Sequence, residues 1–265
     1  SRARLEKIPC AQCLSGWRRH RLPRLFRHRY RGRFAPWLGG AHLAQRYNLR
    51  FPFQPPEASR EKTLQLTAQL LHWELQPGYL EHALALFDAY WQGQGGNLSR
   101  IVDSNISDHW ECYSHHLQAN EEQLKQQGHY LSGMLHYGGE WYWGVDRLFH
   151  LEQRLRDLGA CHEPNEPYLV PRPEIDLTGV DAAHLALHFY PSLNSPYTAI
   201  IFDRTVALAK ACGVAFHHKP VLPMIMRGVA ATPAKGRYIF FDTKREADYF
   251  GVPFGHHVTP IGTPT

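Results

Sequence analysis

The chain lacks any long apolar stretch. No segment approaches the roughly 18 consecutive apolar residues that a membrane-spanning helix requires, and its first residues contain no apolar core followed by a small-residue cleavage site. Cysteine is also sparse, because five cysteines, an odd number, are scattered along 265 residues and form no disulfide framework typical of a secreted protein. We therefore expect a soluble, cytoplasmic protein without a membrane partner.

Metal-binding patterns are weak as well. Cys10 and Cys13 have the Cys-x-x-Cys spacing of a dithiol or zinc site, but no second cysteine pair follows and no strand precedes them. His217 and His218 are adjacent in an expected strand, so their side chains point to opposite faces. We expect no metal site, and a thiol–disulfide oxidoreductase that uses Cys10 and Cys13 is kept as an alternative.

Positive charge is concentrated in one segment. Residues 1–34 hold eleven Lys or Arg against one acid, Glu6, which gives this segment a charge of +10 and leaves −5 for the rest. A basic arm can bind a polyanion by releasing counterions. The chain has no zinc-finger spacing, RNA-binding aromatic signature or heptads, so we expect a solvated segment and no nucleic-acid partner.

What the chain does have is enough apolar material to fold. Hydrophobic residues make up 43% of it and aromatic residues 12%, which suits one large or two small domains. In its first half, apolar residues recur at spacings of three and four, and turn or capping residues separate the periodic stretches. The helices predicted there cover 41–47, 59–77, 79–91 and 107–128.

After residue 128 the periodicity changes to that of strands. Short aromatic-rich runs surround Gly138 and Gly139, which is a strong hairpin signal. The elements expected here are strands at 129–137 and 140–143, followed by a helix from 146 to 159. This is a strand–strand–helix unit.

A proline-rich segment, 160–180, is expected to link this unit to the next. The elements predicted beyond it are a strand at 185–189, a helix at 196–212, a strand at 214–221 and a helix at 234–250. The fold class is therefore α/β. A strand–helix–strand unit and a strand–strand–helix unit are the two halves of a thioredoxin fold, present here in reversed order.

One turn carries a resemblance to a known family. Leu193-Asn194-Ser195-Pro196-Tyr197 follows an expected strand and opens a helix, and it resembles the active-site turn of kappa-class glutathione transferases and 2-hydroxychromene-2-carboxylate isomerases. These belong to the DsbA-like thioredoxin-fold family. Further similarities lie at 138–148 (GGEWYWGVDRL), 220–228 (PVLPMIMRG), 241–248 (FDTKREAD) and 251–255 (GVPFG).

The resemblance also implies a domain organisation. Residues 1–159 would be an incomplete first thioredoxin-like domain with a helical insertion, residues 160–180 a linker, and residues 181–265 an incomplete second domain. The chain would then be a section of a tandem protein. The alternative is one permuted thioredoxin fold, in which both halves pack on each other.

The function implied by the resemblance is that of a glutathione-dependent isomerase or transferase acting on a small aromatic or electrophilic substrate. Ser195 stands where redox relatives carry their cysteine, so thiol–disulfide exchange at this position is excluded. Its hydroxyl would instead donate a hydrogen bond to the glutathione thiolate. A plain helix N-cap is the other interpretation of Ser195.

Further site residues follow from the same resemblance. Those expected to bind glutathione are Val145, Asp146 and Arg147, and those expected to contact the substrate are Tyr197, Met226 and Arg227. Asp146 would pair with the γ-glutamyl ammonium group, or would cap its helix. Gly133 occupies the position of the family's cis-proline, which favours a non-catalytic scaffold or binding module as the alternative. A homodimer is left open.

Overall fold

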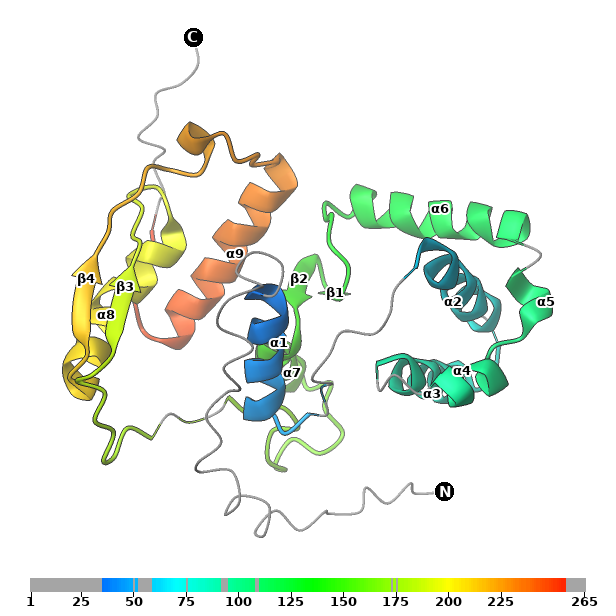
Figure 1. Ribbon diagram of the computed structural model, residues 1–265, viewed down its shortest axis with the longest axis horizontal. Coiled ribbons are helices and arrows are strands. Elements are labelled where there is room, and N and C mark those ends of the chain that lie inside the picture. The colour runs from blue at the N-terminus through cyan, green and yellow to red at the C-terminus, as the bar shows by residue number, and fades with distance from the viewer. Residues whose placement is uncertain are drawn as a thin grey trace.

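A computed structural model gives the arrangement of most of the chain (Figure 1). The residues that it describes are 35–49, 51, 59–74, 76–91, 95–107, 110–172, 174 and 176–255. The basic segment 1–34, with Cys10 and Cys13, lies outside them. Within the described part of the chain, no helix combines the length and the apolar character that crossing a membrane requires.

The first part of the described chain is helical. Its elements are α1 (Ala35–Arg46), α2 (Arg60–Trp73), α3 (Tyr79–Trp91), α4 (Gly95–Ile101), α5 (Ser104–Ser107) and α6 (Trp110–Gln126). α2 begins where the sequence predicts, because the Ser59 side chain accepts a hydrogen bond from the backbone N–H of Lys62 at 3.0 Å. Asn48 follows α1 in the left-handed conformation, with a φ of 51°. We call α2 to α6 the helical unit (Figure 1).

The sequence did not predict α4 and α5. α4 begins inside the glycine run 93–96, because its Leu98 packs into the core of the helical unit and is only 6% exposed. That core consists of Leu66, Trp73, Leu86, Ala89 and Leu98. Burial of each large side chain contributes about 1.5–3 kcal/mol, which outweighs the cost of about 1 kcal/mol for a helical glycine.

The predicted hairpin is confirmed. β1 (Met134–Tyr137) pairs antiparallel with β2 (Glu140–Trp143), and α7 (Val145–Asp157) follows. Gly138 and Gly139 form the turn with φ angles of 54° and 81°, which glycine adopts without strain. β1 is shorter than predicted, because the buried His129 ring accepts the backbone N–H of Leu131 and Gly133 has a φ of 69°.

The predicted strand–helix–strand unit is also present. β3 (Ala186–Phe189), α8 (Pro196–Cys212) and β4 (Ala215–His218) follow one another, and β3 pairs parallel with β4. A short 3-10 helix, η2 (Ile225–Arg227), precedes α9 (Pro233–Tyr249). The hydrogen bond from Val221 N–H to the Pro191 carbonyl, 2.9 Å long, extends the pairing beyond β4 toward the predicted end of the strand.

The two pairs of strands are separate sheets, with no ladder joining them in the described residues. The α/β class is therefore confirmed, whereas the thioredoxin-like arrangement, tandem or permuted, stays a prediction. Helices α7 and α9, and no strand pairing, connect the hairpin unit to the strand–helix–strand unit. Arg147 of α7 binds Asp242 of α9, and one turn further along His150 binds Glu246.

The proline-rich segment 160–180 is held against α7. The Arg156 guanidinium donates hydrogen bonds to three of its backbone carbonyls, those of Pro164, Glu166 and Pro167, at 2.7, 2.8 and 3.1 Å. Glu152, one turn earlier, accepts the backbone N–H groups of Leu169 and Val170 at 2.9 and 3.1 Å. These contacts fix the segment to α7.

Candidate functional site

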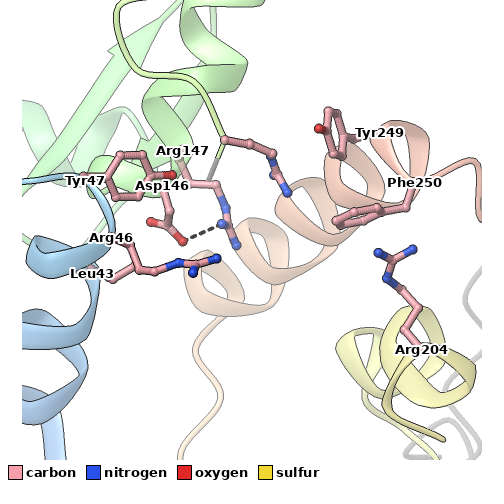
Figure 2. Close-up of a pocket in the computed structure, with 9 residues that line it drawn as sticks. Leu43, Arg46, Tyr47, Asp146, Arg147, Arg204, Tyr249 and Phe250 are labelled. Atoms are coloured by element: carbon pink, nitrogen blue, oxygen red, sulfur yellow. Dashed lines mark hydrogen bonds and ion pairs between the residues drawn. The ribbon is translucent and has the colours of Figure 1, made fainter. Parts of the chain in front are cut away.

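A cleft of about 440 Å³ lies where α1, α7, α8 and α9 approach one another. Nine residues line it: Leu43, Arg46, Tyr47, Asp146, Arg147, Arg172, Arg204, Tyr249 and Phe250 (Figure 2). Four of the nine are arginines and only one is a carboxylate. The remaining lining is largely aromatic, so the cleft suits an anion that also has apolar surface.

The start of α7 positions two of the predicted residues in this cleft. Gly144 precedes the helix with a φ of 74°, and no side chain caps the helix. Asp146 is therefore not the cap that the sequence allowed. Its Oδ2 atom instead accepts a hydrogen bond from Nη1 of Arg147 at 2.7 Å.

A buried carboxylate, that of Asp242, neutralises the charge of Arg147. Its Nε and Nη2 atoms donate to Oδ1 and Oδ2 of Asp242 at 2.8 and 3.0 Å, and Asp242 is only 1% exposed. Burial by itself raises the pKa of the Asp242 carboxyl. The hydrogen bonds and charge of Arg147, with a hydrogen bond from Tyr197, outweigh burial and hold that pKa below its usual range. Asp242 is therefore a carboxylate at neutral pH.

A second buried carboxylate, Glu246, lies one turn further along α9. It accepts a hydrogen bond from Nε2 of His150 at 2.8 Å and another from Arg172. Burial by itself raises the pKa of Glu246, but these hydrogen bonds and the charges of Arg147 and Arg172 lower it to about 2. The Arg172 guanidinium also lies over the Tyr249 ring, 4.2 Å from its centre. Arg172 thus has both an ionic and an aromatic partner.

The other two arginines of the cleft, Arg46 and Arg204, have no carboxylate partner among the described residues. Nη2 of Arg46 donates to the backbone carbonyl of Glu174 at 3.2 Å, and the Arg204 guanidinium lies 3.8 Å from the centre of the Phe250 ring. Neither forms an ion pair with a described carboxylate. Figure 2 shows them entering from α1 and α8 on opposite sides of the cleft. The cleft therefore carries an excess of positive charge.

Ser195 caps α8, as one interpretation of the sequence predicts. Its Oγ accepts a hydrogen bond from the backbone N–H of Thr198 at 3.3 Å. Arg204 lies nine residues later on the same helix, about 13 Å along its axis. Ser195 is not among the residues that line the cleft.

Tyr197 joins the first turn of α8 to the cleft residues. Its hydroxyl donates to Oδ2 of Asp242 at 2.7 Å, and Asp242 in turn binds Arg147. Burial and the nearby charge of Asp242 raise the pKa of Tyr197 well above its ordinary value, so the hydroxyl stays protonated. The structure thus brings Asp146, Arg147 and Tyr197 together, although they lie about 50 residues apart in the sequence.

The other predicted residues lie outside this group. Val145 is the first residue of α7, and it does not line the cleft. Met226 and Arg227 lie in η2, where Met226 is 56% exposed and Nε of Arg227 donates to the Leu222 carbonyl at 3.1 Å. The residues of the site that sequence reasoning missed are Leu43, Arg46, Tyr47, Arg172, Arg204, Tyr249 and Phe250.

No metal or disulfide centre is found in the described ranges. No group of three or more His, Cys, Asp or Glu side chains is placed to hold a metal ion there. Cys112, Cys161 and Cys212 are unpaired thiols. The prediction for Cys10 and Cys13 falls outside the described residues.

Comparison with known proteins identifies no relative. No protein-family model matches the chain, and no curated protein or solved structure matches it either. The resemblance to the DsbA-like family therefore stays a prediction from the sequence.

Proposed function

We propose that the cleft binds a small organic anion with two carboxylates, and that glutathione is this ligand. The supporting observation is the unequal pairing of the arginines. Arg147 and Arg172 contact buried carboxylates, whereas Arg46 and Arg204 form no ion pair with any described residue. Both guanidiniums are exposed, so a ligand carboxylate that meets either one gains up to about 1 kcal/mol.

The charges of glutathione match those of the cleft. Glutathione has two carboxylates and one ammonium group at neutral pH. Arg46 and Arg204 face the cleft from opposite sides, which supports one carboxylate contact at each side (Figure 2). Asp146 has its Oδ2 atom bound to Arg147, and its Oδ1 atom accepts no hydrogen bond within the described residues, so Oδ1 is open to an ammonium group.

We further propose that the chain is an isomerase or transferase that uses bound glutathione. Ser195 would donate a hydrogen bond to the glutathione thiolate. The Ser195 oxygen accepts the Thr198 N–H, and its own proton has no acceptor among the described residues. In a transferase reaction the sulfur would attack an electrophilic carbon of a small aromatic substrate, forming a C–S bond as the leaving group departs with the bonding electrons.

A binding module without catalysis is the second candidate. The observation that favours it is the separation along α8 between Ser195 and Arg204, about 13 Å. Ser195 does not line the cleft in this structure. A ligand bound between Arg46 and Arg204 whose sulfur does not reach along α8 to Ser195 would leave the serine without a catalytic role.

Calorimetric titration of the whole chain with reduced glutathione tests the binding proposal. The double variant Arg46→Gln/Arg204→Gln should bind about tenfold more weakly than the wild type, because two contacts of up to about 1 kcal/mol each are lost. Arg100→Gln on α4 removes an arginine that does not line the cleft, and it should leave the affinity unchanged. No binding at millimolar glutathione, or equal affinity in the double variant, would refute the proposal.

A further inference from the structure

Helix α3 has two apolar faces, and only one of them packs against the helical unit. Ala83, Leu86 and Ala89 are buried on the inner face. Leu80 and Leu84 lie on a second face and are 71% and 69% exposed. A helix that is apolar on two sides is typical of one that packs against two partners.

The exposed side chains form a continuous stripe. Leu80, Leu84 and Phe87, with Trp91 next in the series, follow a spacing of four, three and four residues, so they line up along one side of the helix over about 16 Å. Phe87 is 48% exposed, and the Trp91 ring stacks on the Phe51 ring with centres 6.3 Å apart. The same spacing forms the seam between two packed helices.

Acidic side chains border this stripe. Glu81 and Asp88 lie seven residues apart, on the side of the stripe away from the core. Both are exposed, and neither forms an ion pair with a described residue. The surrounding sequence has the same sign, since residues 59–126 contain nine acidic and four basic side chains.

We propose that the α3 stripe is a docking site for a basic amphipathic helix of a partner protein. The apolar face of that helix would cover Leu80, Leu84 and Phe87, and Lys or Arg residues along its flank would meet Glu81 and Asp88. Helix-in-groove and coiled-coil complexes combine an apolar seam with flanking charge pairs in this way. The acidic border is the observation that selects a basic occupant.

A second copy of the chain that packs antiparallel along α3 fits the stripe less well. Two copies related by a twofold axis across antiparallel α3 helices would place the same acidic row of each helix on the same side of the seam. Glu81 and Asp88 would then face the like charges of the other copy, which opposes association.

The test uses the whole chain and two fluorescent synthetic helical peptides. Both peptides have leucine at the seam positions, one with lysine and one with glutamate at the flanking positions. The lysine peptide should bind more tightly by fluorescence anisotropy, and Leu84→Glu/Phe87→Glu should weaken its binding at least tenfold. Leu169→Glu changes an 86% exposed leucine in another part of the molecule, and it should leave binding unchanged.

A charge-reversal variant distinguishes the proposed contact from non-specific hydrophobic binding of the peptides. Glu81→Lys/Asp88→Lys leaves every apolar residue in place and should reverse the preference toward the glutamate peptide. Equal binding of both peptides to the wild type, or no loss of binding in Leu84→Glu/Phe87→Glu, would overturn the proposal. A wild-type dimer in analytical ultracentrifugation that Leu84→Glu dissociates would overturn it too, since a second copy would then cover the stripe.

Discussion

Arg147 of α7 and Asp242 of α9 form a two-point ion pair between residues 95 positions apart in the sequence. The two hydrogen bonds, 2.8 and 3.0 Å long, join the hairpin-and-helix part of the chain to the strand–helix–strand part. No strand pairing performs this role in the described residues. Because Arg147 also lines the cleft, the contact that joins the two parts also positions the proposed ligand site.

Breaking this ion pair should destabilise the fold. Asp242→Leu removes the two-point partner of Arg147 and the acceptor of the Tyr197 and Tyr238 hydroxyls, so we expect the free energy of unfolding to fall by about 3–5 kcal/mol. Urea denaturation followed by circular dichroism measures the change. The double variant Arg147→Met/Asp242→Leu removes both charges of the pair and should recover part of the loss, since the Tyr197 and Tyr238 hydroxyls still lack their acceptor. A loss below 1 kcal/mol in the single variant would show that the pair does not hold the parts together.

Stability should also fall in acid because of Glu246. Burial opposes ionisation of Glu246, but His150 and Arg172 lower its pKa from 4.5 to about 2. A carboxyl with a lowered pKa in the folded state stabilises the protein above its unfolded pKa and loses that effect as the pH falls through the folded pKa. We therefore expect up to about 3 kcal/mol to be lost between about pH 5 and pH 2.

Urea denaturation at several pH values measures this dependence. Glu246→Gln removes the titrating carboxyl, so its free energy of unfolding should change less steeply over the same pH range. Asp242, whose pKa is also lowered, contributes in the same direction and remains in that variant. Equal slopes for wild type and Glu246→Gln would contradict the role given to Glu246.

Local signals made much of the fold predictable. Ser59 and Ser195 cap helices at the predicted positions, and Gly138 and Gly139 form the predicted turn, because each depends on a few neighbouring residues. α4 could not be predicted in this way, since burial of Leu98 in the core decides its formation. Likewise, no local pattern shows that β1–β2 and β3–β4 remain separate sheets.

The site was only partly predictable, because local sequence signals do not show which distant residues the tertiary fold brings together. Asp146 and Arg147 are neighbours at the start of a helix, and a sequence motif singles them out. Arg46 and Arg204 lie on α1 and α8, and only the tertiary fold brings them to the same cleft. One signal was available on α9, where Asp242 and Glu246 are four residues apart and therefore share a helix face.

Substitutions of Ser195 should separate its capping role from the proposed catalytic role. Ser195→Ala removes the cap and should cost about 1 kcal/mol of stability. Ser195→Asp keeps a capping oxygen but has no hydroxyl, so it should keep the stability and lose the proposed activity. Ser195→Thr keeps both groups and should retain both properties.

Two measurements on each Ser195 variant are needed, urea denaturation and the initial rate of glutathione conjugation to a chloronitrobenzene. In that reaction the thiolate sulfur displaces chloride from the ring carbon. Conjugation by Ser195→Asp at the wild-type rate would exclude the hydroxyl as the thiolate donor. Wild-type binding of glutathione without any conjugation would support the binding-module candidate instead.

Arg156 should determine how tightly the segment 160–180 lies on α7. Its guanidinium binds three carbonyls of this segment and lies 4.5 Å from the centre of the Tyr168 ring. Arg156→Gln loses most of these contacts, so chymotrypsin should cleave after Tyr168 several times faster than in the wild type, as mass spectrometry of the fragments would show. Arg100→Gln, on α4, is the matched control and should be cleaved there at the wild-type rate. Unchanged cleavage in Arg156→Gln would mean that Glu152, which accepts the Leu169 and Val170 N–H groups, is sufficient to hold the segment in place.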